Sequence, residues 1–156
     1  MVHHEFYPDF GINYVCALEP FSLGELFSLL LKANENPQIA EVLSQPTLLD
    51  LRFVDLGRLE APDIRRHLMK KTSLDPKLMR IPCAYLVKGI AGQAALRMAN
   101  IFAELSGLSP EDHTIVTDDI RQALNWLADL TGKTEDDVED MVVRLSHEGV
   151  KLFPRA

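Results

Sequence analysis

Residues 81–108 constrain the fold of this chain more than any other stretch, because they combine a strand pattern with a helix pattern. Residues 83–87 have the length and apolar content of a strand that is buried on both faces. From Ala94 onward apolar residues recur at helical spacing, and Gly107 stands where a helix commonly ends in glycine. A buried strand that leads into an amphipathic helix is one unit of a layered α/β structure. We therefore expect the rest of the chain to repeat this unit.

Strand-like and helix-like segments alternate along the whole chain. Residues 8–11 form a turn-rich segment between two strand-like runs, which predicts an antiparallel hairpin. The predicted strands are residues 3–7, 12–19, 47–54, 83–87 and 113–117. The predicted helices begin near residues 22, 62, 94, 119 and 134, with one or two further turns at 38–44. The pattern predicts an α/β fold, in which a leading β-hairpin and βα units form a mixed, mostly parallel sheet of about five strands with helices packed on it, plus an extra C-terminal helix.

Three helix starts carry capping signals. Ser22 precedes Glu25 by three residues and Thr134 precedes Asp137 by three, a spacing typical of capping boxes. Asp118 or Asp119 is the predicted cap of the helix that follows the last strand. The last two helices are expected to end at Gly132 and Gly149, leaving a short tail.

Length and composition indicate one globular unit. The chain has 156 residues, of which 47% are apolar and 25% charged, and we expect an α/β domain over residues 1–132 with a C-terminal helix and tail over 133–156 packed on it. No apolar run approaches a membrane span and no secretory signal pattern is present, so a cytoplasmic location is expected. The net charge of −7 argues against nucleic-acid binding and favours a basic partner.

Four stretches in this order carry a resemblance to a known family: GINYVCALEPFSLGELFSLL, TLLDLRFVDL, IPCAYLVKGIAGQAALRMANIFAEL and HTIVTDDIRQALNWL. Together, over residues 5–130, they resemble the STAS domain, the fold of bacterial anti-sigma-factor antagonists. They resemble more closely the divergent bacterial STAS-like proteins, which are also similar to lipid-binding Sec14 domains. The resemblance implies a STAS-like α/β domain that acts as a regulatory or protein-binding module.

Regulatory STAS domains carry a phosphorylatable serine at the start of a helix, and the matching stretch here is residues 60–64, EAPDI. This stretch has no hydroxyl group, so no phosphate can be attached at the helix N-terminus, where the helix dipole would favour it. The resemblance still places the protein-binding helix here, with Ala61, Pro62, Asp63 and Arg66 as its candidate residues. We expect a protein partner that is bound without serine phosphorylation.

A second hypothesis is a ligand site beyond the carboxyl ends of the strands, where open α/β sheets collect their ligands. The candidate residues at these ends are Asp55, Arg58, Lys88, Gly89 and Gly92. Backbone N–H groups and the Lys88 ammonium would suit a small anionic ligand such as a nucleotide, and the Sec14-like resemblance implies a small apolar, lipid-like one. The alternative, which we favour for the glycines, is that they only permit the turn.

Two further polar pairs have structural interpretations. Asp50 and Arg52 share a face of their predicted strand, either as a buried ion pair or pocket wall or, as we favour, at an edge that faces solvent. Asp118 and Asp119 offer paired carboxylates, but helix capping accounts for at least one of them.

No residue set forms a catalytic or metal-binding signature. Cys16 and Cys83 lie in apolar strand-like runs and are expected to be buried thiols rather than a disulfide. No histidine pair has HExxH spacing, and no serine lies in a GxSxG motif. We therefore predict a protein that is not an enzyme and needs no metal or cofactor. The apolar stripe of Val138, Met141, Val142 and Leu145 must cover the sheet or form a homodimer interface.

Overall fold

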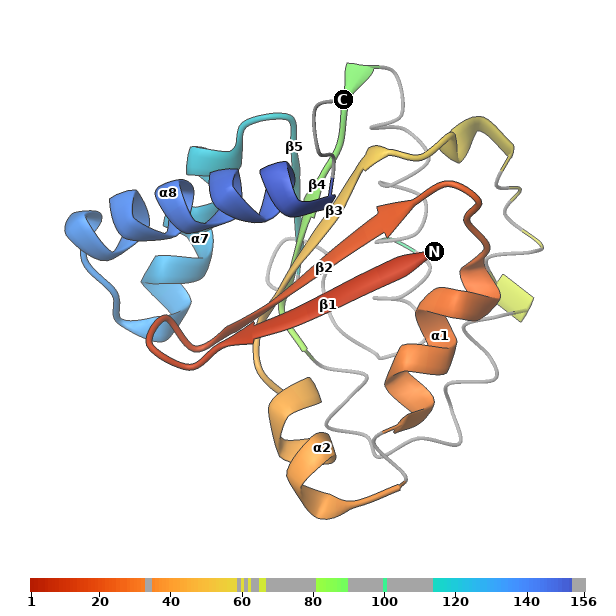
Figure 1. Cartoon of the computed structure of the whole chain (residues 1–156), viewed down its shortest axis with the longest axis horizontal. Helices are drawn as coiled ribbons and strands as arrows, with labels where there is room; N and C mark the ends of the chain where they lie inside the picture. The colour runs from red at the N-terminus through yellow and green to blue at the C-terminus, as the bar shows by residue number, and fades with distance from the viewer. Residues whose placement is uncertain are drawn as a thin grey trace.

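The computed structural model describes residues 1–32, 35–58, 60, 62, 65–66, 81–89, 100 and 114–152. Within this part of the chain the fold is α/β and is built on one five-stranded sheet in the order β1-β2-β3-β4-β5 (Figure 1). β1 is antiparallel to β2, and the other neighbours are parallel. The strands are β1 (Val2–Tyr7), β2 (Ile12–Leu18), β3 (Thr47–Phe53), β4 (Cys83–Leu86) and β5 (Thr114–Thr117). The predicted mixed sheet with its leading hairpin is therefore confirmed.

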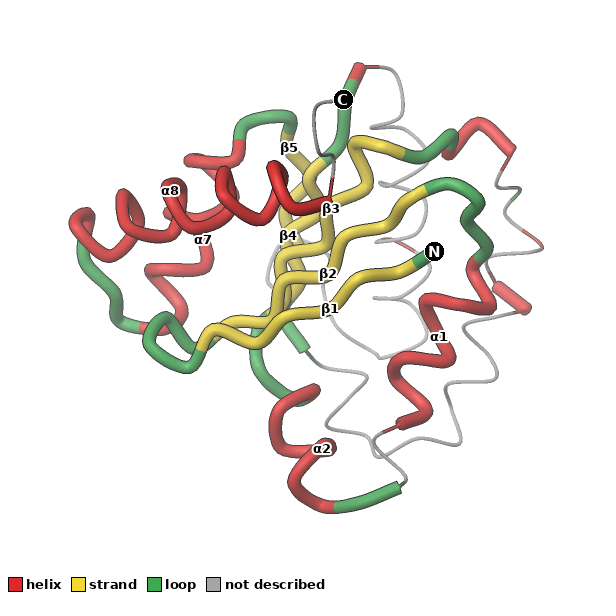
Figure 2. Tube along the Cα trace, in the orientation of Figure 1, coloured by secondary structure: helices red, strands yellow, loops and turns green. Residues whose placement is uncertain are grey.

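Helices cover both faces of the sheet (Figure 2). The described helices are α1 (Leu23–Leu31), α2 (Pro37–Leu43), the 3₁₀ turn η2 (Leu56–Arg58), α7 (Ile120–Thr131) and α8 (Glu135–Leu152). α1 packs on one face through Leu23 and Leu26, whereas α7 and α8 pack on the other. The predicted helices at 62–71 and from Ala94 lie largely outside the described residues. Among the described residues, no helix has the length and apolar character needed to cross a membrane.

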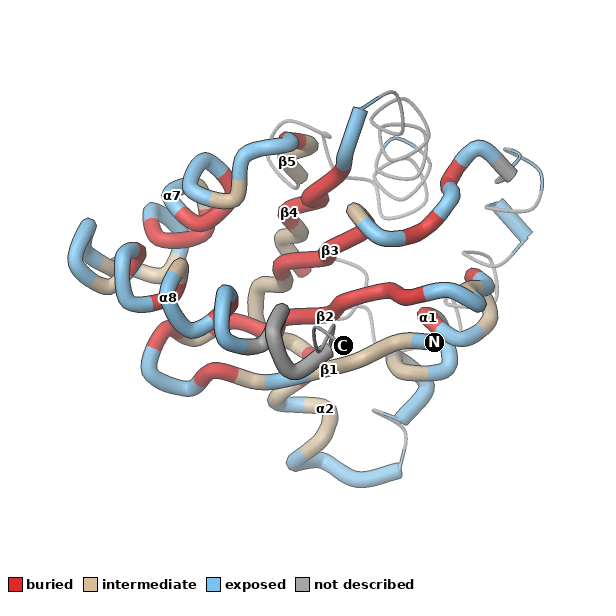
Figure 3. The backbone as a smooth tube through the Cα atoms, turned by 45° about the horizontal axis from the view of Figure 1, so that its top comes forward, coloured by how far each residue is buried: buried red, intermediate tan, exposed pale blue. Residues whose placement is uncertain are grey.

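Side-chain alternation along the central strands produces two cores. Val15, Ala17, Leu49 and Leu51 point to the α1 face. Tyr14, Cys16, Leu18 and Leu48 point to the α7/α8 face, where they meet Leu124, Leu127, Met141 and Leu145. Because both faces are covered and β2 has a neighbour on each side, all seven β2 residues are buried (Figure 3). Much of the apolar stripe of the C-terminal helix, including Val138, Met141 and Leu145, is thus buried against the sheet.

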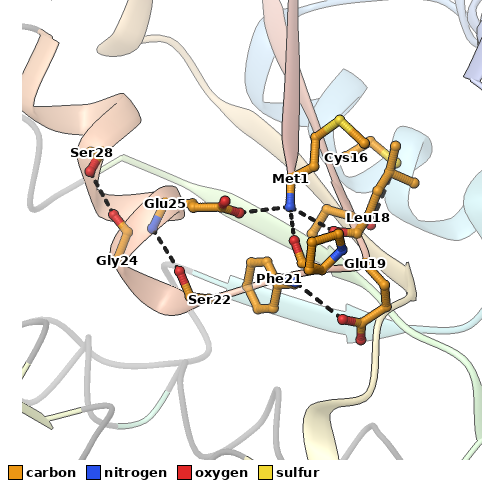
Figure 4. Close-up of polar contacts among 11 residues, drawn as sticks. Met1, Cys16, Leu18, Glu19, Phe21, Ser22, Gly24, Glu25 and Ser28 are labelled. Atoms are coloured by element: carbon orange, nitrogen blue, oxygen red, sulfur yellow. Dashed lines mark hydrogen bonds and ion pairs between the residues drawn. The ribbon is translucent and has the colours of Figure 1, made fainter.

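The start of α1 shows half of the predicted capping box. Ser22 Oγ accepts a hydrogen bond of 3.3 Å from the Glu25 N–H. The Glu25 carboxylate instead lies 2.7 Å from the Met1 ammonium, which also donates to Leu18 O and Pro20 O (Figure 4). These contacts tie the start of β1 to the end of β2 and to the first turn of α1.

The α7–α8 pair begins with two side-chain caps. Asp119, rather than Asp118, caps α7 by accepting the Arg121 N–H at 2.9 Å. Thr134 and Asp137 form the predicted reciprocal box, with Thr134 N–H to Asp137 Oδ2 at 2.9 Å and Asp137 N–H to Thr134 Oγ1 at 3.3 Å. Gly132 lies in the left-handed region at φ +70°, as a C-cap glycine should.

One predicted helix end is wrong. α8 continues through Gly149 to Leu152. A glycine inside a helix costs only about 1 kcal/mol relative to alanine, which does not stop a helix that is anchored by a buried stripe. The next proline is Pro154, beyond the helix.

Candidate functional site

Asp50 is the most unusual residue of the described structure, because it is a carboxylate with no solvent exposure in the middle of the central strand. In the sheet it lies beside Cys16 on β2 and Leu86 on β4. Its Oδ2 accepts the Tyr14 hydroxyl and Arg52 Nη2, each at 2.8 Å. Its Oδ1 accepts Arg52 Nε at 3.0 Å and the Arg52 backbone N–H at 3.2 Å. These four donors offset the cost of removing the charge from water.

The buried carboxylate changes the chemistry of its neighbours. Burial, and then the charge of Asp50, raises the pKa of the Tyr14 phenol well above its ordinary value. Burial, and then the same charge, raises the pKa of the Cys16 thiol to about 11. The hydrogen bonds to Asp50 raise the pKa of the Arg52 guanidinium. At neutral pH the thiol and the phenol therefore stay protonated, and neither is an activated nucleophile or base.

The Arg52 side chain extends from the buried Asp50 carboxylate to the surface of the protein. Its side chain is 32% exposed, and its Cζ lies 5.1 Å from the centroid of the Phe53 ring, within the range of a cation–π contact. Phe53 is 40% exposed at the carboxyl end of β3. The pairing between β2 and β3 shifts by one residue between Cys16 and Leu18, beside this end of the strand.

The favoured interpretation of Asp50 and Arg52 as a solvent-facing edge is wrong. β3 has a neighbour on each side, and helices cover both faces of the sheet. In the sequence, an Asp and an Arg two residues apart form the same pattern whether the strand lies at an exposed edge of the sheet or in its interior. The available signal was the position of the TLLDLRF run between two other apolar strands, which makes it an interior strand of a parallel series.

The predicted ligand residues lie partly at one edge of the sheet. Asp55 is exposed just after β3, and its Oδ1 accepts the Gly57 N–H at 2.9 Å. The Asp55 N–H donates to Glu19 Oε1 at 2.9 Å, which joins the loops after β3 and β2.

At the end of β4, Lys88 and Gly89 are exposed. The φ of +62° at Gly89 accounts for the glycine as a turn residue. Arg58 is the last residue of η2, and Gly92 lies outside the described residues.

The predicted interaction helix is described only at single positions. Pro62 and Arg66 are helical and exposed, as is Arg65 between them. Ala61 and Asp63 lie outside the described residues.

Two other polar features are the buried Asn13, which has a structural role, and a small surface pocket beside Asp9. Asn13 is buried, lies 2.6 Å from His4 Nε2 through its Oδ1, and donates to Val42 O at 2.8 Å, so it ties the hairpin to α2. A shallow pocket of about 30 Å³ is lined by Asp9, Phe10, Asp137, Asp140, Met141 and Arg144. Within the described ranges, no three His, Cys, Asp or Glu side chains are placed to hold a metal ion.

The fold defines the chain as an α/β protein with a mixed five-stranded sheet. Comparison with protein-family models, with curated proteins and with solved structures found no match to the chain.

Proposed function

We propose that the protein is a non-enzymatic, STAS-like interaction module that binds a protein partner without a serine phosphorylation switch. The observation that carries this proposal is the helical, exposed stretch at Pro62, Arg65 and Arg66. This is the stretch that the family resemblance assigns to partner binding. The sheet, with one antiparallel strand pair (β1–β2) and three parallel pairs, is compatible with that resemblance.

The state of the described polar groups supports contact rather than catalysis. Cys16 and Tyr14 are held protonated beside Asp50, and Asp119 is engaged as a helix cap. Residues 60–64 carry no hydroxyl group that could accept a phosphate. Regulation would then depend on the amount or state of the partner.

The net charge of the whole chain, rather than the Arg65 and Arg66 side chains of the proposed surface, favours a basic partner. The chain carries a net charge of −7, and such a charge accelerates association with a surface of opposite sign. The proposal places this association in the cytoplasm of a bacterial cell.

Quantitative affinity capture from a lysate of the source cells tests the proposal. The wild-type chain, the double variant Asp63→Ala/Arg66→Ala and the control Arg144→Ala are immobilised at equal density. Arg144 lies on α8 and is an exposed arginine that pairs with Asp9 at 3.3 Å, so its loss controls for a general loss of surface charge. We expect one protein retained by the wild type and the control, and reduced at least about tenfold by the double variant, which corresponds to about 1.4 kcal/mol. Equal retention by all three chains would contradict the proposed surface.

A further inference from the structure

β1 is an edge strand whose outer side meets no other described strand. It stands at the end of the strand order and pairs with β2 alone (Figure 2). The pairing runs from Val2 to Tyr7 without a shift, so no bulge would interrupt a second ladder. Prolines, lysines and bulges commonly protect edge strands, and β1 contains none of them. Its backbone edge is therefore open to another strand.

The hydrogen bonds to β2 identify the backbone groups that point away from it. Met1 and Leu18 exchange both of their backbone bonds, at 2.7 and 2.8 Å. In an antiparallel pair, residues that exchange bonds in this way alternate with residues that point to the opposite side. The outward N–H and C=O groups of β1 therefore belong to Val2, His4 and Phe6. None of these groups is bonded to the backbone of a described residue.

A second copy of β1 fits this edge in one antiparallel register. A two-fold axis through His4 places Val2 of each copy opposite Phe6 of the other, so every outward group meets an outward group. An axis through Glu5 would instead set two carboxylates face to face. It would also place Val2 opposite Pro8, which has no N–H to donate. Axes through the other residues of β1 leave part of the strand unpaired.

The side chains of β1 are complementary in this register. Val2 and Phe6 are half-buried, and an aliphatic side chain opposite an aromatic one is a favourable cross-strand pair. On the other face the exposed Glu5 lies opposite His3 of the second copy, so its carboxylate faces an imidazole rather than another acid. The His4 imidazole lies 2.6 Å from a side-chain oxygen of β2, which keeps it with its own copy.

We propose that two copies of the chain associate through β1, antiparallel about His4, and join their sheets into one continuous sheet. A single strand pair buries less surface than a permanent interface, so we expect a dissociation constant of about 10–100 µM. The partner surface proposed at Pro62 and Arg66 lies outside β1. The two proposals therefore succeed or fail independently.

Sedimentation velocity of the full chain over about 5–500 µM tests the association. We expect the wild type to shift reversibly from monomer to dimer over this range. His4→Pro removes an outward N–H and should weaken the dimer at least about tenfold. The matched control His4→Ala also loses the imidazole but keeps the N–H, so it should still form the dimer. Circular dichroism verifies that both variants are folded.

Cysteine cross-linking tests the register and does not depend on the folding of His4→Pro. Residues 3 and 5 of the two copies form a close pair that does not exchange backbone bonds, at a separation that suits a disulfide. A mixture of His3→Cys and Glu5→Cys chains should cross-link under mild oxidation at least about fivefold faster than Glu5→Cys alone, whose cysteines lie on the diagonal. Wild-type chains measure the background from Cys16 and Cys83.

Three results would overturn the proposal. The first is a wild type that stays monomeric over the whole concentration range. The second is a dimer that His4→Pro and His4→Ala affect equally, whether both lose it or both keep it. The third is cross-linking as fast in Glu5→Cys alone as in the mixture, which would show that β1 does not pair about His4.

Discussion

Asp50 and Arg52, two residues apart on the central strand, form an ion pair of 2.8 Å in which the carboxylate is fully buried and the guanidinium reaches the surface. The pair joins the core on the α7/α8 face to the carboxyl edge of the sheet. Its geometry leads to two predictions about stability.

Removing the buried charge should strongly destabilise the fold. Asp50→Asn leaves Arg52 and Tyr14 without their charged acceptor, so we expect a loss of about 2–4 kcal/mol in the free energy of unfolding. Urea denaturation followed by circular dichroism measures the change. The control Asp129→Asn, an exposed carboxylate on α7, should change stability by less than about 0.5 kcal/mol. Equal stability of Asp50→Asn and wild type would show that the pair contributes nothing.

The hydrogen bond from the Tyr14 hydroxyl to Asp50 should contribute less to the free energy of unfolding than the charge of Asp50 does. Tyr14→Phe removes one hydrogen bond to a buried charge and keeps the ring, so we expect a loss of about 1–2 kcal/mol. A double-mutant cycle with Asp50→Asn should show a coupling of about 1 kcal/mol. Strict additivity of the two changes would indicate that the hydroxyl acts independently of Asp50.

Stability should fall in alkali because of Cys16. The folded protein holds the pKa of this thiol at about 11, above the ordinary value of 9.0, so the unfolded chain releases its proton first as the pH rises. The contribution of the protonated Cys16 thiol to the free energy of unfolding is fully present below pH 9. It falls by about 2 kcal/mol as the pH rises to 11. Denaturation of the wild type and of Cys16→Ala between pH 7 and pH 11 measures it. The fall should be shallower in Cys16→Ala, and parallel profiles for the two chains would refute the assignment.

Gly89 should behave as a turn residue. Its φ of +62° is in the left-handed region, and an added Cβ would meet no atom of the described residues within 4 Å, so the expected cost of substitution is conformational. Gly89→Ala should cost about 1 kcal/mol, and Gly89→Asn should cost less because asparagine tolerates this region. Thermal denaturation of the two variants checks the order. A larger loss in Gly89→Asn than in Gly89→Ala would contradict it.

Most of the described fold could be predicted from local pattern. The turn before Gly11, the capping pairs at Ser22 and Thr134, and the glycine at 132 each act over a few residues, so their signals survive in the sequence. The end of α8 was missed because one glycine is a weak stop signal.

The site was less predictable because it depends on neighbours in space. The Asp50–Arg52 pair is local, but its burial comes from the order of the strands and from helices α7 and α8, which are distant in sequence. The hydroxyl that holds Asp50 lies on another strand, 36 residues away. An alternating Asp-x-Arg pattern carries no trace of these partners.

Hydrogen exchange of the chain, free and in complex with its captured partner, tests the central claim most directly. A protein that binds through the segment after η2 should show slowed exchange in the peptide that spans residues 60–66. Exchange in α8 should stay unchanged. Protection confined to α8 or to β1, with residues 60–66 unaffected, would contradict the account.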